Sequence, residues 1–172
     1  MIDIKENFLP KDKFEEIQAK LLGENFYWSL ANEIVSKIPE LGATCEEIYN
    51  WQLIHNFYET PATISQDINI LNPIMSIINP RILIRIKANL TPRAEKIIEH
   101  GLHCDVEPPL SNATTSILYL NTNNGYTAFK DGTKIPSVAN TFVSFPSNLK
   151  HTGSTCTNVK FRGLINFNYI NK

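Results

Sequence analysis

The sequence predicts a mainly β fold with N-terminal helices, a β-sandwich or jelly roll whose helices pack on one sheet. Short apolar runs separated by turn residues fill the second half of the chain, whereas apolar residues at helical spacing occur in the first half. With 172 residues, of which 42% are apolar, the chain is long enough for one packed core. We therefore expect a single domain over residues 1–172, with helical support and flanking strands over about 1–79 and the β core over about 80–170.

Two helices are expected in the first half of the chain. In Pro10–Gly23 apolar side chains recur at helical spacing, acidic residues come early, and the final glycine is placed to end the helix. In Ser65–Ile78 a second apolar stripe is interrupted by Pro73, which is unfavourable inside a helix. The aromatic stretch 26–28 fits either a strand or the start of a helix, so its structure stays open.

Strands make up most of the remaining elements. Residues 48–58 are rich in strand formers, and in 82–87 isoleucines alternate with other residues, as in a half-buried strand. Turn signals such as Pro108-Pro109 and Asn123-Asn124-Gly125 separate the later runs. The further strands that we expect are Lys96–Cys104, Thr114–Asn121, Tyr126–Phe129, Thr141–Phe145 and Asn158–Tyr169.

Charge and cysteine content restrict the possible partners and compartment. Sixteen basic and seventeen acidic residues give a net charge of -1, which disfavours a general nucleic-acid binder. Residues 132–172 contain no acidic side chain but several basic ones, so a small anion is a better partner there than a polynucleotide. We predict a soluble, cytoplasmic protein for three reasons. The three cysteines contain no CxxC pair, the N-terminus is unlike a signal peptide, and no apolar run reaches about 20 residues.

Three of the four histidines and one aspartate are candidates for chemistry. On a strand, His103 and Asp105 would point to the same side, as two metal ligands or as a base with its orienting carboxylate. His100 has the opposite parity and is the weaker candidate. His151 follows an apolar run in a turn-rich stretch, where a single histidine is more often an exposed loop residue than a ligand.

Arg162 is the candidate for binding an anion. In 159–169 it shares a strand face with Asn166, and no acidic residue lies near it in the sequence. Because an arginine without a nearby carboxylate is free to pair with a ligand, this position predicts an anion site.

Taken in order, these residues resemble one family, the Fe(II)/2-oxoglutarate-dependent dioxygenases, and most closely its prolyl 4-hydroxylase branch. The resemblance covers about residues 80–170 well and the first third of the chain loosely. The segments 8–10 and 86–89 are also similar to small phage-encoded members. The motifs that carry it are His103-x-Asp105, Ser116-Ile-Leu-Tyr-Leu-Asn121, Asn124-Gly-Tyr-Thr-Ala-Phe129, Val143-Ser-Phe-Pro146, His151-Thr-Gly153 and Arg162.

The resemblance implies a double-stranded β-helix, the jelly roll of two antiparallel sheets, and a set of site residues. His103, Asp105 and His151 would be the catalytic ligands of Fe(II), which leaves coordination positions for 2-oxoglutarate and O2. Arg162 would pair with the far carboxylate of 2-oxoglutarate. The other residues expected around this cosubstrate are Tyr119, Thr127, Asn166 and Ile117.

The implied reaction is the hydroxylation of an unactivated C–H bond with release of succinate and CO2, and ascorbate as reductant. A carboxylate at position 105 favours hydroxylation over halogenation. The resemblance raises a prolyl residue of a peptide or protein as substrate, and small molecules are further possibilities. Nucleic acid is disfavoured by the net charge, and no membrane partner is expected; a phage-encoded member would work in the host cytoplasm.

Two alternatives remain beside this hypothesis. One is a non-catalytic binding protein on the same scaffold, since fold does not determine function. The other is a cupin-like metalloenzyme that uses the same ligands without 2-oxoglutarate, against which Arg162 and Tyr119 speak. His55 and Tyr58 could line a substrate opening, although packing at the edge of the core is the more frequent role of such a histidine. Asn89 could point into the cleft.

Overall fold

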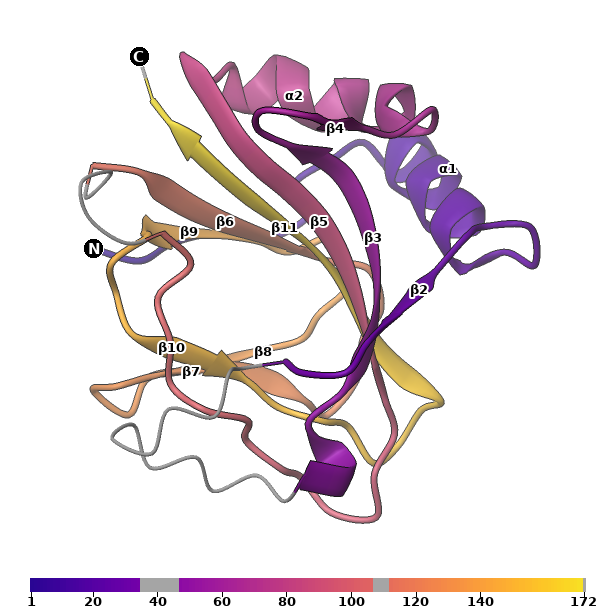
Figure 1. Cartoon of the computed structure of the whole chain (residues 1–172), viewed down its shortest axis with the longest axis vertical. Coiled ribbons are helices and arrows are strands. Elements are labelled where there is room, and N and C mark those ends of the chain that lie inside the picture. Colours follow the sequence, from indigo (N-terminus) through magenta and orange to yellow (C-terminus); the bar gives the residue numbers. More distant parts are fainter. Residues whose placement is uncertain (35–46, 107–111, 172) are drawn as a thin grey trace.

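A computed structural model describes residues 1–34, 47–106 and 112–171 and shows two antiparallel sheets flanked by helices (Figure 1). The larger sheet has the order β1 (Asp3–Lys5), β9 (Phe142–Pro146), β6 (Thr114–Tyr119), β11 (Phe161–Ile170), β5 (Ile82–Pro92), β3 (Gln52–Glu59) and β2 (Ser29–Ala31), with β4 (Thr63–Ile64) beside β3. The smaller sheet has the order β10 (His151–Gly153), β7 (Tyr126–Phe129) and β8 (Lys134–Pro136). This is the predicted jelly roll, with the two sheets face to face.

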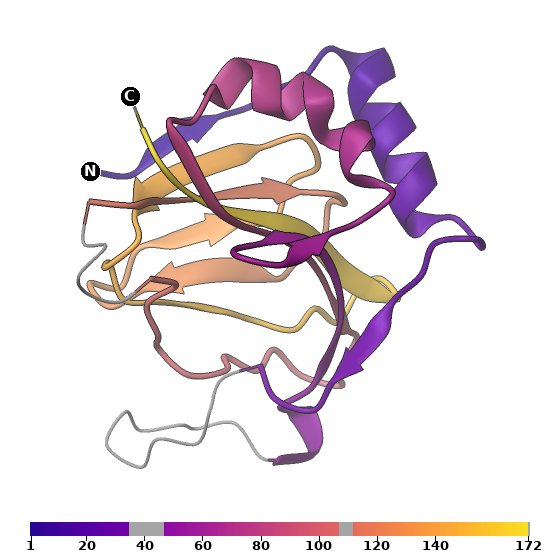
Figure 2. The ribbon, with the colours of Figure 1, turned by 45° about the horizontal axis from the view of Figure 1, so that its top comes forward.

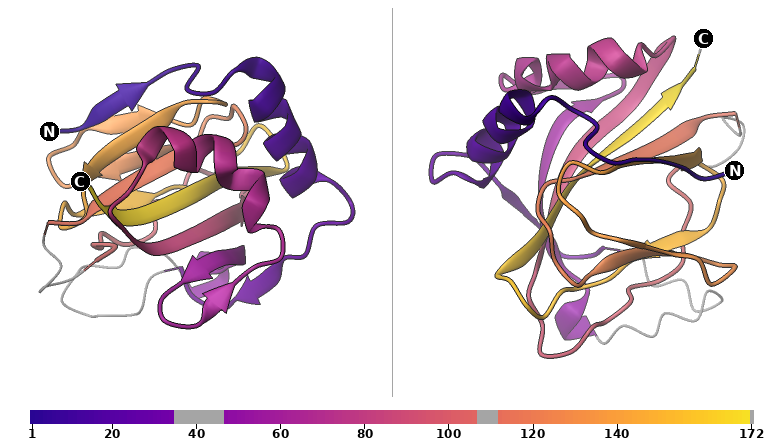
Figure 3. Two further views of the ribbon diagram at one scale, coloured as in Figure 1. Left: turned by 90° about the horizontal axis from the view of Figure 1, so that it is seen from above. Right: turned by 180° about the vertical axis from the view of Figure 1, so that it is seen from behind.

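Helices cover the outer face of the larger sheet (Figures 2 and 3). They are α1 (Lys11–Leu22) and α2 (Asn72–Ile78), the latter preceded by a 3₁₀ turn, η3 (Ile68–Leu71). Their apolar stripes and the outward-facing apolar residues of the sheet form one buried cluster, which includes Phe14, Ile17, Ile74, Ile86 and Ile165. The expectation that the early helices pack on one sheet is confirmed.

The second core lies between the two sheets. Ile117 and Tyr119 of β6 and Val143 of β9 pack there against Phe129 of β7 and Ile135 of β8. Strands β6, β9 and β11 therefore each have one set of side chains under the helices and the alternate set toward the smaller sheet, as the alternation of a strand requires.

The predicted helices differ from the observed ones in detail. The first ends at Leu22 as expected, and a Cβ at Gly23 would lie 2.6 Å from the carbonyl oxygen of Ala19, so the glycine permits this close approach. The second is shorter than expected, since Ser65–Ile78 forms a 3₁₀ turn and then a short helix. Pro73 lies in the first turn of that helix, where no backbone N–H is needed, so it does not interrupt the helix.

The expected strand Lys96–Cys104 is wrong. This segment makes only isolated bridges, Glu99 with Ser154 and His103 with His151, because it runs irregularly beside β10 and does not enter a sheet. The stretch 26–28 is neither helix nor strand. Strands β1, β2, β4, β8 and β10 were not expected, because two or three residues are too few to show an alternating pattern. The turn expected at Pro108–Pro109 lies outside the described residues.

No helix in the described part of the chain is long and apolar enough to cross a membrane.

Candidate metal centre

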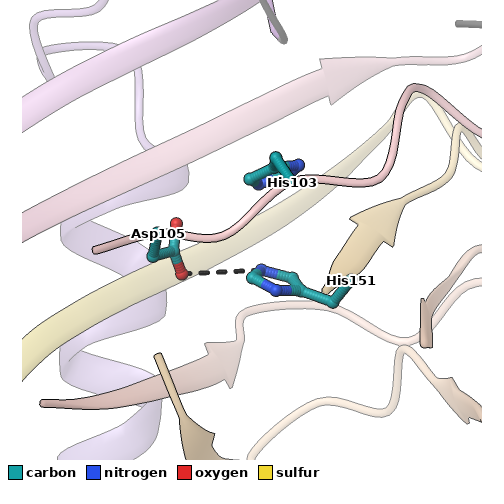
Figure 4. A group of neighbouring side chains, drawn as sticks. All are labelled: His103, Asp105 and His151. Carbon is teal, nitrogen blue, oxygen red and sulfur yellow. Dashed lines mark ion pairs between the residues drawn. The ribbon is translucent and has the colours of Figure 1, made fainter. Parts of the chain in front are cut away.

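The structure brings His103, Asp105 and His151 together at one point between the sheets (Figure 4). One potential ligand atom from each residue lies within 4.8 Å of the other two. The Nε2 atom of His151 is 3.5 Å from Oδ2 of Asp105, and the two imidazole centroids are 4.7 Å apart. His103 and Asp105 come from the irregular segment, and His151 begins β10. His151 is only 3% exposed, so its interpretation as an exposed loop histidine is wrong.

Backbone carbonyls fix the tautomer of both histidines. Nδ1 of His103 is 3.1 Å from the oxygen of Gly101, and Nδ1 of His151 is 3.0 Å from that of Leu149. Because a carbonyl oxygen only accepts hydrogen bonds, each Nδ1 carries the proton and donates it. The lone pair of each neutral ring is therefore on Nε2, the arrangement that metal-binding histidines use.

Asp105 supplies a buried carboxylate beside these rings. Its side chain is 6% exposed; Oδ1 accepts a hydrogen bond from Arg85 Nη2 at 3.2 Å, and Oδ2 accepts one from Asn166 Nδ2 at 3.0 Å. Burial alone would raise the pKa of Asp105, but in the metal-free protein the hydrogen bond and charge of His151 in its protonated form, the charge of protonated His103 and the charge of Arg85 together hold this pKa well below its ordinary value. The group is thus a carboxylate at neutral pH.

This donor set fits a non-haem iron ion. Two neutral imidazole nitrogens and one carboxylate oxygen on a single side are the facial set that binds Fe(II) with open positions. In the described residues no further histidine, cysteine or acidic side chain joins the group. A metal held here would keep positions for other ligands.

Arg85 belongs to a buried polar chain that crosses the larger sheet. The register places Arg85, Asn168 and Thr115 side by side on β5, β11 and β6. Arg85 Nε donates to Oδ1 of Asn168 at 3.0 Å, and Nδ2 of Asn168 donates to Thr115 Oγ1 at 3.0 Å. Thr115 in turn donates to Ser147 Oγ at 3.1 Å, so the guanidinium that holds Asp105 is itself held. Sequence reasoning missed Arg85, although its strand parity with 87 and 89 is a signal.

A cavity extends from the candidate ligands along the inner face of β11. Asn166 lies at the ligand end, where it bonds Asp105, then comes Leu164, and Arg162 is four residues back on the same face. At about 3.3 Å per residue, Arg162 and Asn166 are separated by about 13 Å along the strand. Arg162 and Asn166 lie on the same face of β11, as predicted, because the strand is regular over this stretch.

Arg162 is 3% exposed and is surrounded by neutral groups. Its Nε donates to Ser137 Oγ at 2.7 Å and its Nη2 to Thr127 Oγ1 at 2.9 Å, and the guanidinium lies 5.5 Å from the ring centroid of Tyr119. Within the described ranges no carboxylate is at ion-pair distance from it. Burial lowers the pKa of Arg162, but an arginine remains charged in proteins. A buried cation without a counter-ion favours an anionic ligand.

Glycines make room for this arginine. A Cβ at Gly125 would lie 2.9 Å from Arg162 Cδ, and one at Gly153 would lie 3.2 Å from its Nη1. The Gly153 approach leaves that side of the guanidinium without a covering side chain. Gly153 also lines the cavity, so this open side of the guanidinium faces the space that an anion needs.

The other residues predicted around the cosubstrate divide into two groups. Ile117, Thr127 and Asn166 line the cavity. Tyr119 is fully buried behind it, and its hydroxyl donates to Thr127 Oγ1 at 2.8 Å. Burial raises the pKa of Tyr119, so its hydroxyl keeps the proton that it donates.

The structure also shows where His55, Asn89 and His100 lie relative to the cavity. His55 packs on Phe26 at the edge of the core, and its ring nitrogens lie 2.8 Å from Tyr27 O and Ser65 Oγ. Asn89 does face the cavity. His100 also lines the cavity outside the ligand group, and burial together with the charges of Arg162 and His103 lowers its pKa to about 4.

Comparisons with known proteins identify the fold. No family model matches the sequence, and no curated protein matches it significantly. Among solved structures, a prolyl hydroxylase from Trichoplax adhaerens, in complex with a hypoxia-inducible-factor peptide, is 16% identical with a TM-score of 0.64, covering 99% of this chain and 83% of that one. A prolyl-4-hydroxylase from Pseudomonas putida is 15% identical with a TM-score of 0.57, covering 99% and 92%.

A further similar structure carries ligands. HygX from Streptomyces hygroscopicus, solved with nickel and 2-oxoglutarate bound, is 11% identical with a TM-score of 0.57, covering 99% of this chain and 83% of that one. At such low identities these likenesses establish the shared fold.

Proposed function

We propose that this protein is an Fe(II)- and 2-oxoglutarate-dependent oxygenase that hydroxylates an unactivated C–H bond. The observation that carries the proposal is the cavity itself, which has the His103, Asp105 and His151 group at one end and the buried, uncompensated Arg162 at the other. A dianion that chelates a metal through one end and presents a carboxylate at the other matches both ends.

The residues have separate tasks in this proposal. His103 and His151 hold Fe(II) through Nε2, because their Nδ1 atoms are bonded to carbonyls, and Asp105 holds it through a carboxylate oxygen. Arg162 pairs with the distal carboxylate of 2-oxoglutarate. Thr127 fixes Nη2 of that guanidinium.

The neutral neighbours shape the cosubstrate site. Tyr119 orients the Thr127 hydroxyl from behind, and Ile117 and Leu164 supply apolar walls that exclude water between the metal and the arginine. Asn166 keeps Asp105 in place. When bound, iron supplies the activation of O2, and oxidative decarboxylation of 2-oxoglutarate to succinate and CO2 accompanies hydroxylation of the substrate.

A prolyl residue in a peptide is the first substrate to test. The support is the fold shared with two prolyl hydroxylases, one of them solved with a peptide. The net charge of -1 gives no support to a nucleic-acid substrate.

The decisive experiment is succinate release by the purified protein with Fe(II), ascorbate, O2 and 2-oxoglutarate, alongside Asp105→Asn as the matched control. We expect succinate from the wild-type protein, increased by the true substrate, and none above background from the variant. Calorimetry without O2 measures 2-oxoglutarate binding independently of turnover. A wild-type protein that binds metal but neither binds nor consumes 2-oxoglutarate would contradict the proposal and leave the two alternatives, a binding protein or a cupin-like enzyme.

A further inference from the structure

A second cation, Lys87, lines the cavity on the wall opposite Ser137 and Thr127, the two residues that bind Arg162. It lies on β5, directly across from Asn166 of β11, and therefore at the end of the cavity where Asn166 contacts Asp105. In the part of the chain that the structure describes, no carboxylate is at ion-pair distance from its ammonium. Asp105 and Glu59 attract it only from farther away.

The surroundings of Lys87 do not favour a positive charge. Burial, and then repulsion by Arg85, lower the pKa of Lys87, and the attraction of the two more distant carboxylates does not offset them. A partly buried ammonium of this kind is stabilised by an anion that comes with a ligand.

The cofactors of the proposed function do not provide that anion. The distal carboxylate of 2-oxoglutarate is matched by Arg162, its other carboxylate and Asp105 are matched by the metal ion, and Asp105 also pairs with Arg85. Among the described residues, positive charges in the loaded cavity then outnumber negative ones, and Lys87 is the cation that has no close partner there.

Asn89 gives a second, independent sign of a ligand on the same wall. It lies two residues from Lys87 on the same face of β5, about 7 Å along the strand. Its Oδ1 is buried and has no hydrogen-bond partner among the described residues. A buried amide oxygen in this state costs free energy unless a ligand donates an N–H or O–H to it. Gln52 of β3 and Thr91 of β5 continue the polar wall beyond it.

We propose that Lys87 and Asn89 recognise the primary substrate, which carries a carboxylate for Lys87 and an N–H or O–H donor for Asn89 Oδ1. This inference rests on the proposed function and names the substrate class for that site. A free amino acid offers this pair of groups, and so does a peptide with an acidic residue close to the hydroxylated position. The shared chemistry is the carboxylate, and the experiment distinguishes its two sources.

The first test measures anion binding without turnover. The protein is loaded with Zn(II) and 2-oxoglutarate, so that Arg162 is occupied and no reaction occurs, and is titrated with acetate and with the neutral isostere acetamide while amide NMR signals are followed. We expect acetate to bind at least about tenfold more tightly than acetamide in the wild-type protein. Lys87→Met should remove this preference, whereas the exposed Lys160→Met should keep it.

The 2-oxoglutarate affinity of Lys87→Met separates the two possible roles of this lysine. We expect it to stay within about threefold of the wild type. If it falls tenfold or more, Lys87 serves the cosubstrate, and the inference is wrong. Equal binding of acetate and acetamide to the wild-type complex also overturns it while leaving the proposed function intact. Failure of the wild-type protein to bind 2-oxoglutarate would contradict both the inference and the proposed function.

The second test identifies the source of the carboxylate. Succinate release is measured with free amino acids against their carboxamides, and with proline-containing peptides that have Asp or Glu against the same peptides with Asn or Gln. If the acids of one of these two sets stimulate succinate release, that set is the source of the carboxylate. Lys87→Met should bring the ratio of stimulation by the acid to stimulation by the amide to about one. Asn89→Leu should weaken the stimulation of succinate release by the acid, while the acid-to-amide ratio stays as in the wild type. An acid preference that survives in Lys87→Met contradicts the inference.

Discussion

His103 and His151 are joined by two reciprocal backbone hydrogen bonds: the His103 N–H donates to His151 O at 2.9 Å, and the His151 N–H donates to His103 O at 3.0 Å. This bridge sets the two imidazoles on the same side, because paired residues of an antiparallel bridge point the same way. The relative position of two candidate ligands is therefore determined by the backbone. Substitution of a ligand side chain should affect the metal much more than the fold.

Asp105→Asn should abolish hydroxylation and weaken Fe(II) binding. The amide keeps the volume and can still accept from Arg85, but it removes the negative charge from the ligand set. Loss of a supporting residue around a metal typically costs about tenfold to a hundredfold in affinity, so loss of a ligand should cost at least about tenfold. Anaerobic calorimetry with Fe(II) measures this, with thermal unfolding of the metal-free protein as the control for folding. Unchanged turnover in this variant would refute the ligand assignment.

Arg85→Met should lower metal affinity through the position of Asp105. The substitution removes the donor to Asp105 Oδ1 and breaks the chain to Asn168, so the carboxylate is held only by the hydrogen bond from Asn166 and its position is less well fixed. We expect Fe(II) to bind about tenfold more weakly, within the range for residues that support a ligand. Arg81→Met, an exposed arginine just before the same strand, is the matched control. Equal metal affinity in the two variants would show that Asn166 alone orients the carboxylate.

How far the sequence predicts this site depends on the regularity of each strand. For β11 the alternation places Arg162 and Asn166 correctly, because the strand is long and regular there. His103 and Asp105 do lie on the same side, but in an irregular segment, so strand alternation is not the cause. His151 has no apolar alternation around it, and its strand of three residues is formed by pairing with β7 and by the bridge to His103, neither of which the local sequence shows.

The strand β5 shows where a polarity pattern can mislead. An alternation of isoleucine with charged residues usually means one face in the core and one in water. Here Ile86 packs under the helices, whereas on the polar face Lys87 and Asn89 line an internal cavity and Arg85 binds Asp105. Nothing in the local sequence distinguishes a cavity from solvent, because that difference is made by the smaller sheet, which is formed by residues far along the chain.

His100 should make the metal-free protein less stable as the pH falls below about 6.5. Its pKa is lowered from 6.5 to about 4 in the folded state, so between these values the unfolded chain binds more protons than the folded one. Stability is therefore unaffected above about 6.5, decreases as the pH falls to about 4, and loses at most about 3 kcal/mol. Urea unfolding across this range measures the slope. His100→Gln should flatten it, and an equal slope in both proteins would contradict the assignment.

Arg162 should control the affinity for 2-oxoglutarate and leave the affinity for Fe(II) nearly unchanged. Its guanidinium is buried, is held by Ser137 and Thr127, and lies at the far end of the cavity from the candidate ligands. Removing one side of a buried charge pair costs about 2–5 kcal/mol, which is about thirtyfold to several thousandfold in affinity. We expect Arg162→Gln to lose this much. Arg162→Lys should be milder, since it keeps the charge and loses the planar two-pronged contact.

Calorimetry without O2 gives both affinities for each variant, and Lys160→Met serves as the control for a lysine that is close in sequence but exposed. A further distinction comes from the glycines around the arginine. Gly153→Ala would place a Cβ 3.2 Å from Arg162 Nη1, so it should weaken 2-oxoglutarate binding without removing any charge. If Arg162→Gln and Gly153→Ala both bind 2-oxoglutarate as the wild type does, the anion end of the cavity lies elsewhere, and the cation to test next is Lys87.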